Sequence, residues 1–236
     1  MPQPKLTLAC RDYDHTRALR DRSVAVDGAE LEVLCITPPS QIFLRMLRNE
    51  EFDLSEMSLS NYLISLGRGD TRFVGLPVFP SRIFRHSYIW INSNSGIQEP
   101  RDLIGKRVGI ADYSMTALLF ARGMLKHQYG VLPEDLHWLR TRAEHVPVRI
   151  PPGIRVEDLG KGRKLDQALE EGQIDAMNPP ICRPAPTTSP RRYGGCFPTL
   201  ATPKRSISGK PEFTRSCIWW SCGVRLTSSI AASPQV

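Results

Sequence analysis

The sequence predicts an α/β protein made of two lobes. Up to Asp175, short apolar runs of strand type alternate with helical patterns, and such alternation is typical of a mostly parallel sheet. The chain has 236 residues, enough for one large domain or two small ones. After Ala176 both periodicities end. We therefore expect a first α/β lobe over residues 1–84, a partial second lobe over 85–176 and an irregular, disordered or out-of-frame tail over 177–236.

The first lobe is expected to contain four strands and two helices. Residues 39–50 should form a helix, because Ile42, Met46 and Leu47 fall on one helical face. A second helix is expected over 59–69, with a glycine at its end. The strands are expected at residues 5–10, 29–37, 54–58 and 73–79.

The second lobe should begin near residues 84–92, where we expect a hinge and, between the lobes, a ligand cleft. Its long helix is expected over 114–130, with Ser114 as a candidate N-cap and Gly130 as its stop. A shorter helix should close at Gly172. The strands are expected at residues 86–93, within 102–110, at 135–140 and from 176.

The formal charge of +7 is concentrated in the tail. Of the 31 basic and 24 acidic residues, eight basic and one acidic residue lie from Ala176 onward, which leaves 23 of each before it. A neutral main body argues against a nucleic-acid partner. Four of the six cysteines are also in the tail, at spacings that fit no zinc motif, whereas Cys10 and Cys35 in the strands are expected to be buried thiols.

The sequence also excludes several classes of protein. No apolar run has the length of a membrane span, so we expect no membrane partner. The N-terminus has no long apolar region and no small-residue cleavage site, which predicts a cytoplasmic protein. Asp12 and His15 are too few to form a ligand set, and we expect no metal and no cofactor.

Anion-binding side chains gather just after the expected strand ends around residues 50–87. They are Ser58, Ser60, Ser81, Arg82, Arg85 and His86. In an open α/β sheet the ligand lies outside the carboxyl ends of the strands. The pattern therefore predicts a site for a small anionic molecule.

The chain resembles the 4,5-dihydroxyphthalate decarboxylases, cytoplasmic relatives of type II periplasmic solute-binding proteins. The resemblance runs from Lys5 to Ala176. It is carried by LACRDYDHTRAL, FLRMLRNEEFDLSEMSLSNYLISLGRGD, PVFPSRIFRHS and DLIGKRVGIADYSMTALLFARGML, of which the second and third are specific to the family. The resemblance implies a two-lobed periplasmic-binding-protein-like (type II) fold with an incomplete second half. It also implies decarboxylation of 4,5-dihydroxyphthalate to protocatechuate and CO2.

Such a substrate, a small aromatic dicarboxylate, suggests roles for particular residues. Arginine binds a carboxylate through two parallel hydrogen bonds, so Arg11, Arg82 and Arg85 are candidates, with a solvated surface charge as the alternative for each. Helix starts attract carboxylates, which adds Ser58, Ser60, Ser114 and Thr116, although N-capping is an equal explanation. Tyr13 and Tyr113 could stack on the ring or simply pack.

Proton delivery to the ring needs an acid, and removal of a phenolic proton needs a base. His86 suits either role by its ordinary pKa, and it could instead be a structural hydrogen-bond donor. Asp12 and Glu56 are the principal carboxyl candidates, with Asp14 and His15 nearby.

The tail suggests a shifted reading frame. If it is read one nucleotide out of frame, the degenerate code from Cys196 onward permits FPDFRDAEAEYFRKTGIYPIMHLVVVR, which resembles a piece of the family pattern; Cys217 then stands where histidine is permitted. A natural linker is the alternative. Under the frame hypothesis the chain as written is inactive or poorly soluble, a fragment of the enzyme. A solute-binding protein that captures an aromatic or sulfonate anion for a transporter is the competing function.

Overall fold

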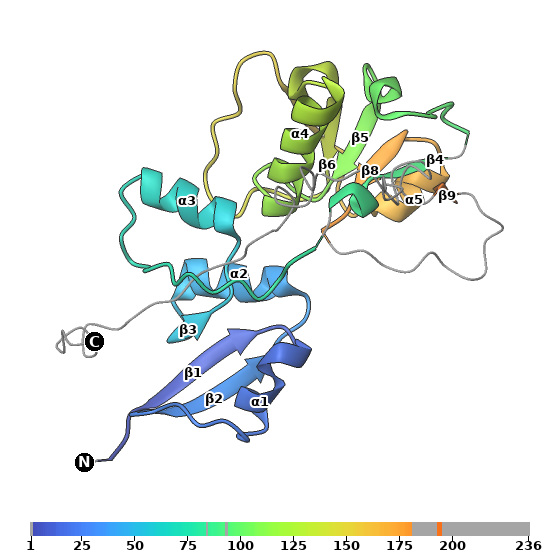
Figure 1. Ribbon diagram of the computed structural model, residues 1–236. Helices are drawn as coiled ribbons and strands as arrows, with labels where there is room; N and C mark the ends of the chain where they lie inside the picture. The colour runs from blue at the N-terminus through green and yellow to red at the C-terminus, as the bar shows by residue number, and fades with distance from the viewer. Residues whose placement is uncertain (1, 84, 93, 181–192, 195–236) are drawn as a thin grey trace, which may run out of the picture. The chain divides into compact units, whose positions relative to one another are not determined.

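The computed structural model describes residues 2–83, 85–92, 94–180 and 193–194 (Figure 1). The chain divides into two compact units between Arg82 and Ile83. In each unit parallel strands are connected through helices, so the predicted α/β class is confirmed. Most of the expected irregular tail, with its four cysteines, lies outside the described residues. No helix in the described part of the chain is both long and apolar enough to span a bilayer.

The first unit is built on a three-stranded parallel sheet with the order β2-β1-β3. Helix α2 covers it with Ile42, Met46 and Leu47, the apolar face predicted from the sequence. The elements are β1 (Lys5–Cys10), η1 (Asp14–Thr16), α1 (Arg17–Arg20), β2 (Glu30–Cys35), α2 (Pro39–Asn49), β3 (Leu54–Ser55) and α3 (Leu59–Gly67).

The second unit holds a six-stranded mixed sheet with the order β7-β6-β5-β8-β4-β9. Strand β4 runs antiparallel to its neighbours β8 and β9, and the other pairs are parallel. Its strands are β4 (Trp90–Asn92), β5 (Arg107–Ile110), β6 (His137–Arg140), β7 (Arg155–Asp158), β8 (Ala176–Asn178) and β9 (Tyr193–Gly194). Its helical segments are η2 (Arg85–Tyr88), η3 (Pro100–Leu103), α4 (Thr116–Tyr129), η4 (Pro133–Asp135) and α5 (Leu165–Glu170).

Helices α4 and α5 cover opposite faces of this sheet. Successive strand residues point to opposite faces. Accordingly, Val108 and Ile110 of β5 belong to the apolar cluster that includes α4, whereas Gly109 between them faces α5. A Cβ at Gly109 would lie 2.4 Å from the Ile174 side chain, so a larger residue there would force the side chains packed against this face to shift. The sheet is thus buried on both sides, as parallel sheets usually are.

Four local expectations are wrong. The strand expected at 54–58 ends at Ser55, so Glu56 follows the strand instead of lying in it. Residues 73–79 form no strand, because Pro77 lacks an amide hydrogen for a sheet ladder. Arg82 therefore does not follow a strand end. Helix α4 begins at Thr116 with Met115 at the N-cap, so Ser114 is not its cap. The expected strand at 86–93 is shortened to Trp90–Asn92 and preceded by a 3-10 turn that contains His86.

The cysteine expectation holds for one residue only. Cys10 is buried, as predicted, because β1 is the central strand of its sheet. Cys35 is exposed, because it ends the edge strand β2.

Candidate functional site

Glu56 is the buried carboxyl group of the first unit. It follows β3 directly, and its amide donates to the Ala9 carbonyl at 2.9 Å, which extends the pairing of β3 with β1. Only 4% of Glu56 is exposed. The carboxyl ends of β1 and β3 thus bring Glu56 next to the residues that follow Cys10, where a ligand of an α/β sheet is expected.

Two donors from the segment after β1 hold the Glu56 carboxyl group. The Arg11 amide donates to Oε2 at 2.9 Å, and the Tyr13 hydroxyl donates to Oε1. Burial raises the pKa of Glu56, while the bonds from Tyr13 and Arg11 oppose this rise in part. The group is therefore suited to hold a proton that an exposed carboxylate would have lost.

Tyr13 lies in a small cluster of its own. Its ring stacks on His15 with 5.1 Å between the ring centroids, and the Arg11 guanidinium lies 5.5 Å from the ring centre. Burial and the negative charge of Glu56 raise the pKa of the Tyr13 hydroxyl, which also contacts the Ser81 side chain. Tyr13 consequently remains a hydrogen-bond donor over the physiological pH range.

The other predicted residues of the first unit have different surroundings. Asp12 is exposed and pairs with Arg20, away from the Glu56 carboxyl group. Arg82 is exposed, and its Nε donates to the Phe79 carbonyl at 3.2 Å. Ser58 and Ser60, both buried at the start of α3, have their hydroxyl oxygens 3.1 Å apart. The structure therefore brings Arg11, Tyr13 and Glu56 into mutual contact, while Asp12 belongs to a surface ion pair.

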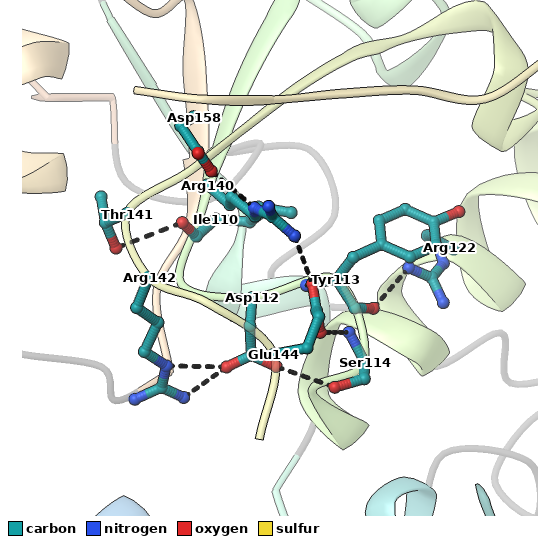
Figure 2. A network of polar contacts seen from close by, with 10 residues as sticks. All are labelled: Ile110, Asp112, Tyr113, Ser114, Arg122, Arg140, Thr141, Arg142, Glu144 and Asp158. Carbon is teal, nitrogen blue, oxygen red and sulfur yellow. Dashed lines mark hydrogen bonds and ion pairs between the residues drawn. The ribbon is translucent and has the colours of Figure 1, made fainter. Parts of the chain in front are cut away.

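In the second unit, a carboxylate of the protein itself occupies the turn before α4 (Figure 2). The amides of Tyr113 and Ser114 donate to the two oxygens of Glu144 at 2.9 and 2.8 Å. Arg140 approaches the same carboxylate at 3.5 Å. The sequence predicted that this helix start would attract a substrate carboxylate, but these two N–H groups already have an acceptor.

A second buried acid stands beside this turn (Figure 2). Asp112 is 1% exposed and accepts hydrogen bonds from Arg142 Nε at 2.8 Å and from the Ser114 hydroxyl at 3.2 Å. On the other side, Arg122 donates to the Tyr113 carbonyl at 2.8 Å, and its guanidinium lies 3.7 Å from the Tyr113 ring centre. Burial lowers the pKa of Arg122 and raises that of Tyr113. Tyr113 is therefore held on both its backbone and its ring.

His86 and Arg85 lie near the opposite end of α4. His86 Nε2 donates to the Gln128 side chain at 2.9 Å, and its ring meets that of Tyr129 edge-on at 6.4 Å. Arg85 is buried with its guanidinium 4.8 Å from the Tyr88 ring centre, and burial lowers its pKa. Twelve residues of helix separate Gln128 from Thr116, about 18 Å at 1.5 Å per residue. One benzene ring cannot contact both His86 and Thr116.

Sequence reasoning missed Glu144, Arg140, Arg142 and Arg122. Three of them carry a sequence signal, because Arg140 ends β6 and Arg142 and Glu144 follow within four residues of that strand end, the position at which site residues are expected. Within the described residues no group of three histidine, cysteine or acidic side chains has the arrangement to hold a metal ion.

The chain is similar to two curated proteins. It is 36% identical over 183 residues to the 4,5-dihydroxyphthalate decarboxylase of Comamonas testosteroni, a match that covers 75% of this chain and 55% of that protein. It is 31% identical over 252 residues to the enzyme of the same name from Pseudomonas putida, which covers 99% of this chain and 93% of that protein. The chain thus spans little more than half of the first relative. No family model matches it.

Among solved structures, the chain is matched by two sulfonate-binding proteins. These are the periplasmic aliphatic sulphonate binding protein of Escherichia coli and the alkanesulfonate-binding protein of Xanthomonas axonopodis pv. citri. Both have a TM-score of 0.47, with 18% and 16% identity; each match covers 75% of this chain and 54% or 55% of the other.

The parallel strands and their connecting helices make the chain an α/β protein of two compact units. Its identity to the Pseudomonas protein over nearly the whole chain is decisive for the family: the chain belongs to the 4,5-dihydroxyphthalate decarboxylase family.

Proposed function

We propose that this chain carries part of the site of a carboxy-lyase that converts 4,5-dihydroxyphthalate to 3,4-dihydroxybenzoate and CO2, with Glu56 as the proton donor. Membership of the family supports the reaction. The buried, hydrogen-bonded carboxyl group of Glu56 is the observation that supports the assignment of the donor.

The reaction replaces a carboxylate on a ring carbon by a proton. The hydroxyl para to that carbon loses its proton and moves toward a ketone, which pushes electrons to the carbon that carries the carboxylate. A proton is added there, the bond to the carboxylate breaks, and CO2 leaves as the ring becomes aromatic again; the phenolate so formed takes back the proton it lost. The protein must therefore supply one proton to carbon and accept one from a phenol.

Glu56 suits the first of these tasks. Burial raises its pKa, so a larger fraction is protonated near neutral pH than for an exposed carboxyl group. Tyr13 and the Arg11 amide each engage one carboxyl oxygen, which fixes the plane of the group before the substrate binds. A donor already held in position adds little ordering cost when the reaction occurs.

Substrate recognition is assigned to arginines of the first unit. The half-buried Arg11 lies two residues before Tyr13, and the exposed Arg82 directly follows Ser81, whose side chain contacts the Tyr13 hydroxyl. A guanidinium forms two parallel hydrogen bonds with a carboxylate, a geometry that lysine lacks. We therefore assign Arg82 to bind a substrate carboxylate. Arg11 supports the substrate ring indirectly, through its contact with the ring of Tyr13. Arg85 is already packed on Tyr88 and is left out of this assignment.

The test is a turnover assay with 4,5-dihydroxyphthalate, in which 3,4-dihydroxybenzoate is measured by chromatography. Phthalate, which lacks the hydroxyls that feed electrons to the ring, is the matched control and should not react. The assay should be run on the 236-residue chain and on a version whose tail is read one nucleotide out of frame. The frame hypothesis expects turnover only in the second.

Two results would overturn the proposal. Tight binding of the substrate by calorimetry, with no product from either version, would favour a solute-binding protein. Normal turnover by a Glu56→Gln variant would leave the reaction in place and remove Glu56 as its proton donor.

A further inference from the structure

Two cysteines of the first unit are direct neighbours in its sheet. Cys10 ends β1, Cys35 ends β2, and the two residues are paired in the parallel register. Neighbouring strands lie about 4.8 Å apart. This spacing is within the range of roughly 4.4–6.8 Å between Cα atoms that a disulfide requires.

Both sulfur atoms face the same short helical segment. The Thr16 side chain contacts the Cys10 sulfur, and Arg20 donates to the Cys35 sulfur at 3.7 Å. Thr16 and Arg20 are four residues apart along η1 and α1, which places them on one helical face. The two thiols are therefore on one side of the sheet, beneath one turn of this segment.

The two thiols differ in their access to solvent. Cys35 is exposed at the sheet edge, whereas Cys10 is 2% exposed in the central strand. Burial, with the nearby charge of Glu56, raises the pKa of the Cys10 thiol to about 11. A dissolved reagent consequently meets Cys35 first, while Cys10 is protected until a reactive sulfur is delivered beside it.

We propose that Cys10 and Cys35 form a thiol–disulfide exchange site for a low-molecular-weight disulfide. The Cys35 thiolate attacks one sulfur of the small disulfide, whose S–S bond breaks and releases one thiolate. Cys10, losing its proton as it reacts, then attacks the Cys35 sulfur of the mixed disulfide and displaces the second small thiolate. The protein dithiol is oxidised by two electrons, the small disulfide is reduced to two thiols, and the protons pass to the leaving thiolates.

The pair of cysteines lies next to the contact among Arg11, Tyr13 and Glu56, but the exchange proposed for it does not depend on the proposed decarboxylation. Cys10 immediately precedes Arg11, whose amide holds the Glu56 carboxyl group at 2.9 Å. A bond from Cys10 to Cys35 would constrain the strand end that supplies this amide. Formation of the bond can be measured by mass alone, whether or not the chain has turnover.

The experiment treats the native chain with oxidised glutathione, blocks remaining thiols with iodoacetamide and maps tryptic peptides without reduction. Residues 6–11 and 23–45 form two separate tryptic peptides, each with one cysteine. We expect these two peptides to be linked by a disulfide.

The two single variants separate the steps of the exchange. In Cys10→Ser, Cys35 should retain a stable mixed disulfide with glutathione. In Cys35→Ser, Cys10 should stay unmodified at least tenfold longer than Cys35 does in the native chain.

Circular dichroism of each variant controls for folding, and phenylarsine oxide gives a second measurement. This arsenical bridges two neighbouring thiols, so it should protect both cysteines from iodoacetamide in the native chain. In each single variant it should leave the remaining cysteine of the pair unprotected. The proposal is wrong if glutathione remains on Cys35 in the native chain without a linked peptide. It is equally wrong if phenylarsine oxide leaves both thiols open to alkylation.

Discussion

Each described unit has a buried acidic side chain after its parallel strands, Glu56 in the first and Asp112 in the second, and the two are held differently. Asp112 is held by the Arg142 guanidinium, and Glu144 by two backbone amides with Arg140 nearby. Glu56, in contrast, accepts its two hydrogen bonds from a phenol and one amide, both neutral donors. A carboxylate bound to a guanidinium is stabilised as an anion and suits a structural role. A buried carboxyl group with neutral donors can keep a proton and deliver it.

The largest expected effect comes from Glu56→Gln. The amide keeps the shape of the side chain but cannot donate a carboxyl proton, so kcat for 4,5-dihydroxyphthalate should fall by about two to four orders of magnitude. This kcat should be measured in the version of the chain that turns over the substrate, either the 236-residue chain or the one with the shifted tail.

Asp12→Asn is the matched control for Glu56→Gln. Asp12 is an exposed acid of the same region, paired with Arg20. Its kcat should stay within about threefold of the parent, since exposed ion pairs contribute little. Equal losses in the two variants would show that burial with neutral donors does not mark the acid that reacts.

In the second unit, the stability of the chain should depend most on the guanidinium that pairs with the buried Asp112. Arg142→Met leaves the buried carboxylate of Asp112 without its guanidinium, and the free energy of unfolding should fall by about 3 kcal/mol. Urea denaturation measures this change.

Arg163→Met serves as the control for the Arg142 variant. Arg163 pairs with Glu171 at 3.3 Å, with about half of each side chain exposed, so the loss there should stay below about 1 kcal/mol. If Arg142→Met proves as mild as Arg163→Met, the guanidinium is not what sustains Asp112.

Glu144→Gln should have a smaller effect. Glutamine retains one acceptor oxygen but presents an amide NH2 to the second of the two N–H donors, from Tyr113 or Ser114. Loss of one charge-assisted bond should cost about 1–2 kcal/mol in unfolding free energy and shift the amide resonances of both residues. In Glu157→Gln, which alters an exposed acid paired with His137, these resonances should stay in place.

Part of this comparison could be read from the sequence. The alternation of strands and helices predicts the α/β class, and Glu56 is a candidate as a carboxyl group of the expected site region, but only the structure shows that it follows β3 rather than lying within a strand. The case for Arg82 from the sequence depends on a strand at residues 73–79, which Pro77 prevents. His86 is a candidate by residue type alone, whereas its position beside Gln128 depends on how α4 packs. Glu144 escaped notice because its two donors lie 30 and 31 residues away in the chain.

The smallest expected effect is the pH dependence of stability due to Glu56. Its pKa is raised in the folded state, so between the unfolded and folded pKa values the folded chain binds more protons than the unfolded chain. The stability that Glu56 contributes is therefore fully present below its unfolded pKa and is lost as pH rises through its folded pKa. The slope due to this group cannot exceed about 1.4 kcal/mol per pH unit.

Glu56→Gln, which does not titrate, isolates that slope. The difference in unfolding free energy between the parent and Glu56→Gln should change in favour of the variant as pH rises from about 4 toward 8, as measured by urea denaturation at several pH values. Glu51→Gln is the control, because the hydrogen bond with Arg45 lowers the pKa of Glu51, so the difference for this variant should change in the opposite direction. A Glu56 difference independent of pH would mean that this carboxyl group is ionised in the folded state as readily as in the unfolded chain. The contrast between the two units would then lose its physical basis, since a neutral set of donors would stabilise a buried anion as well as a guanidinium does.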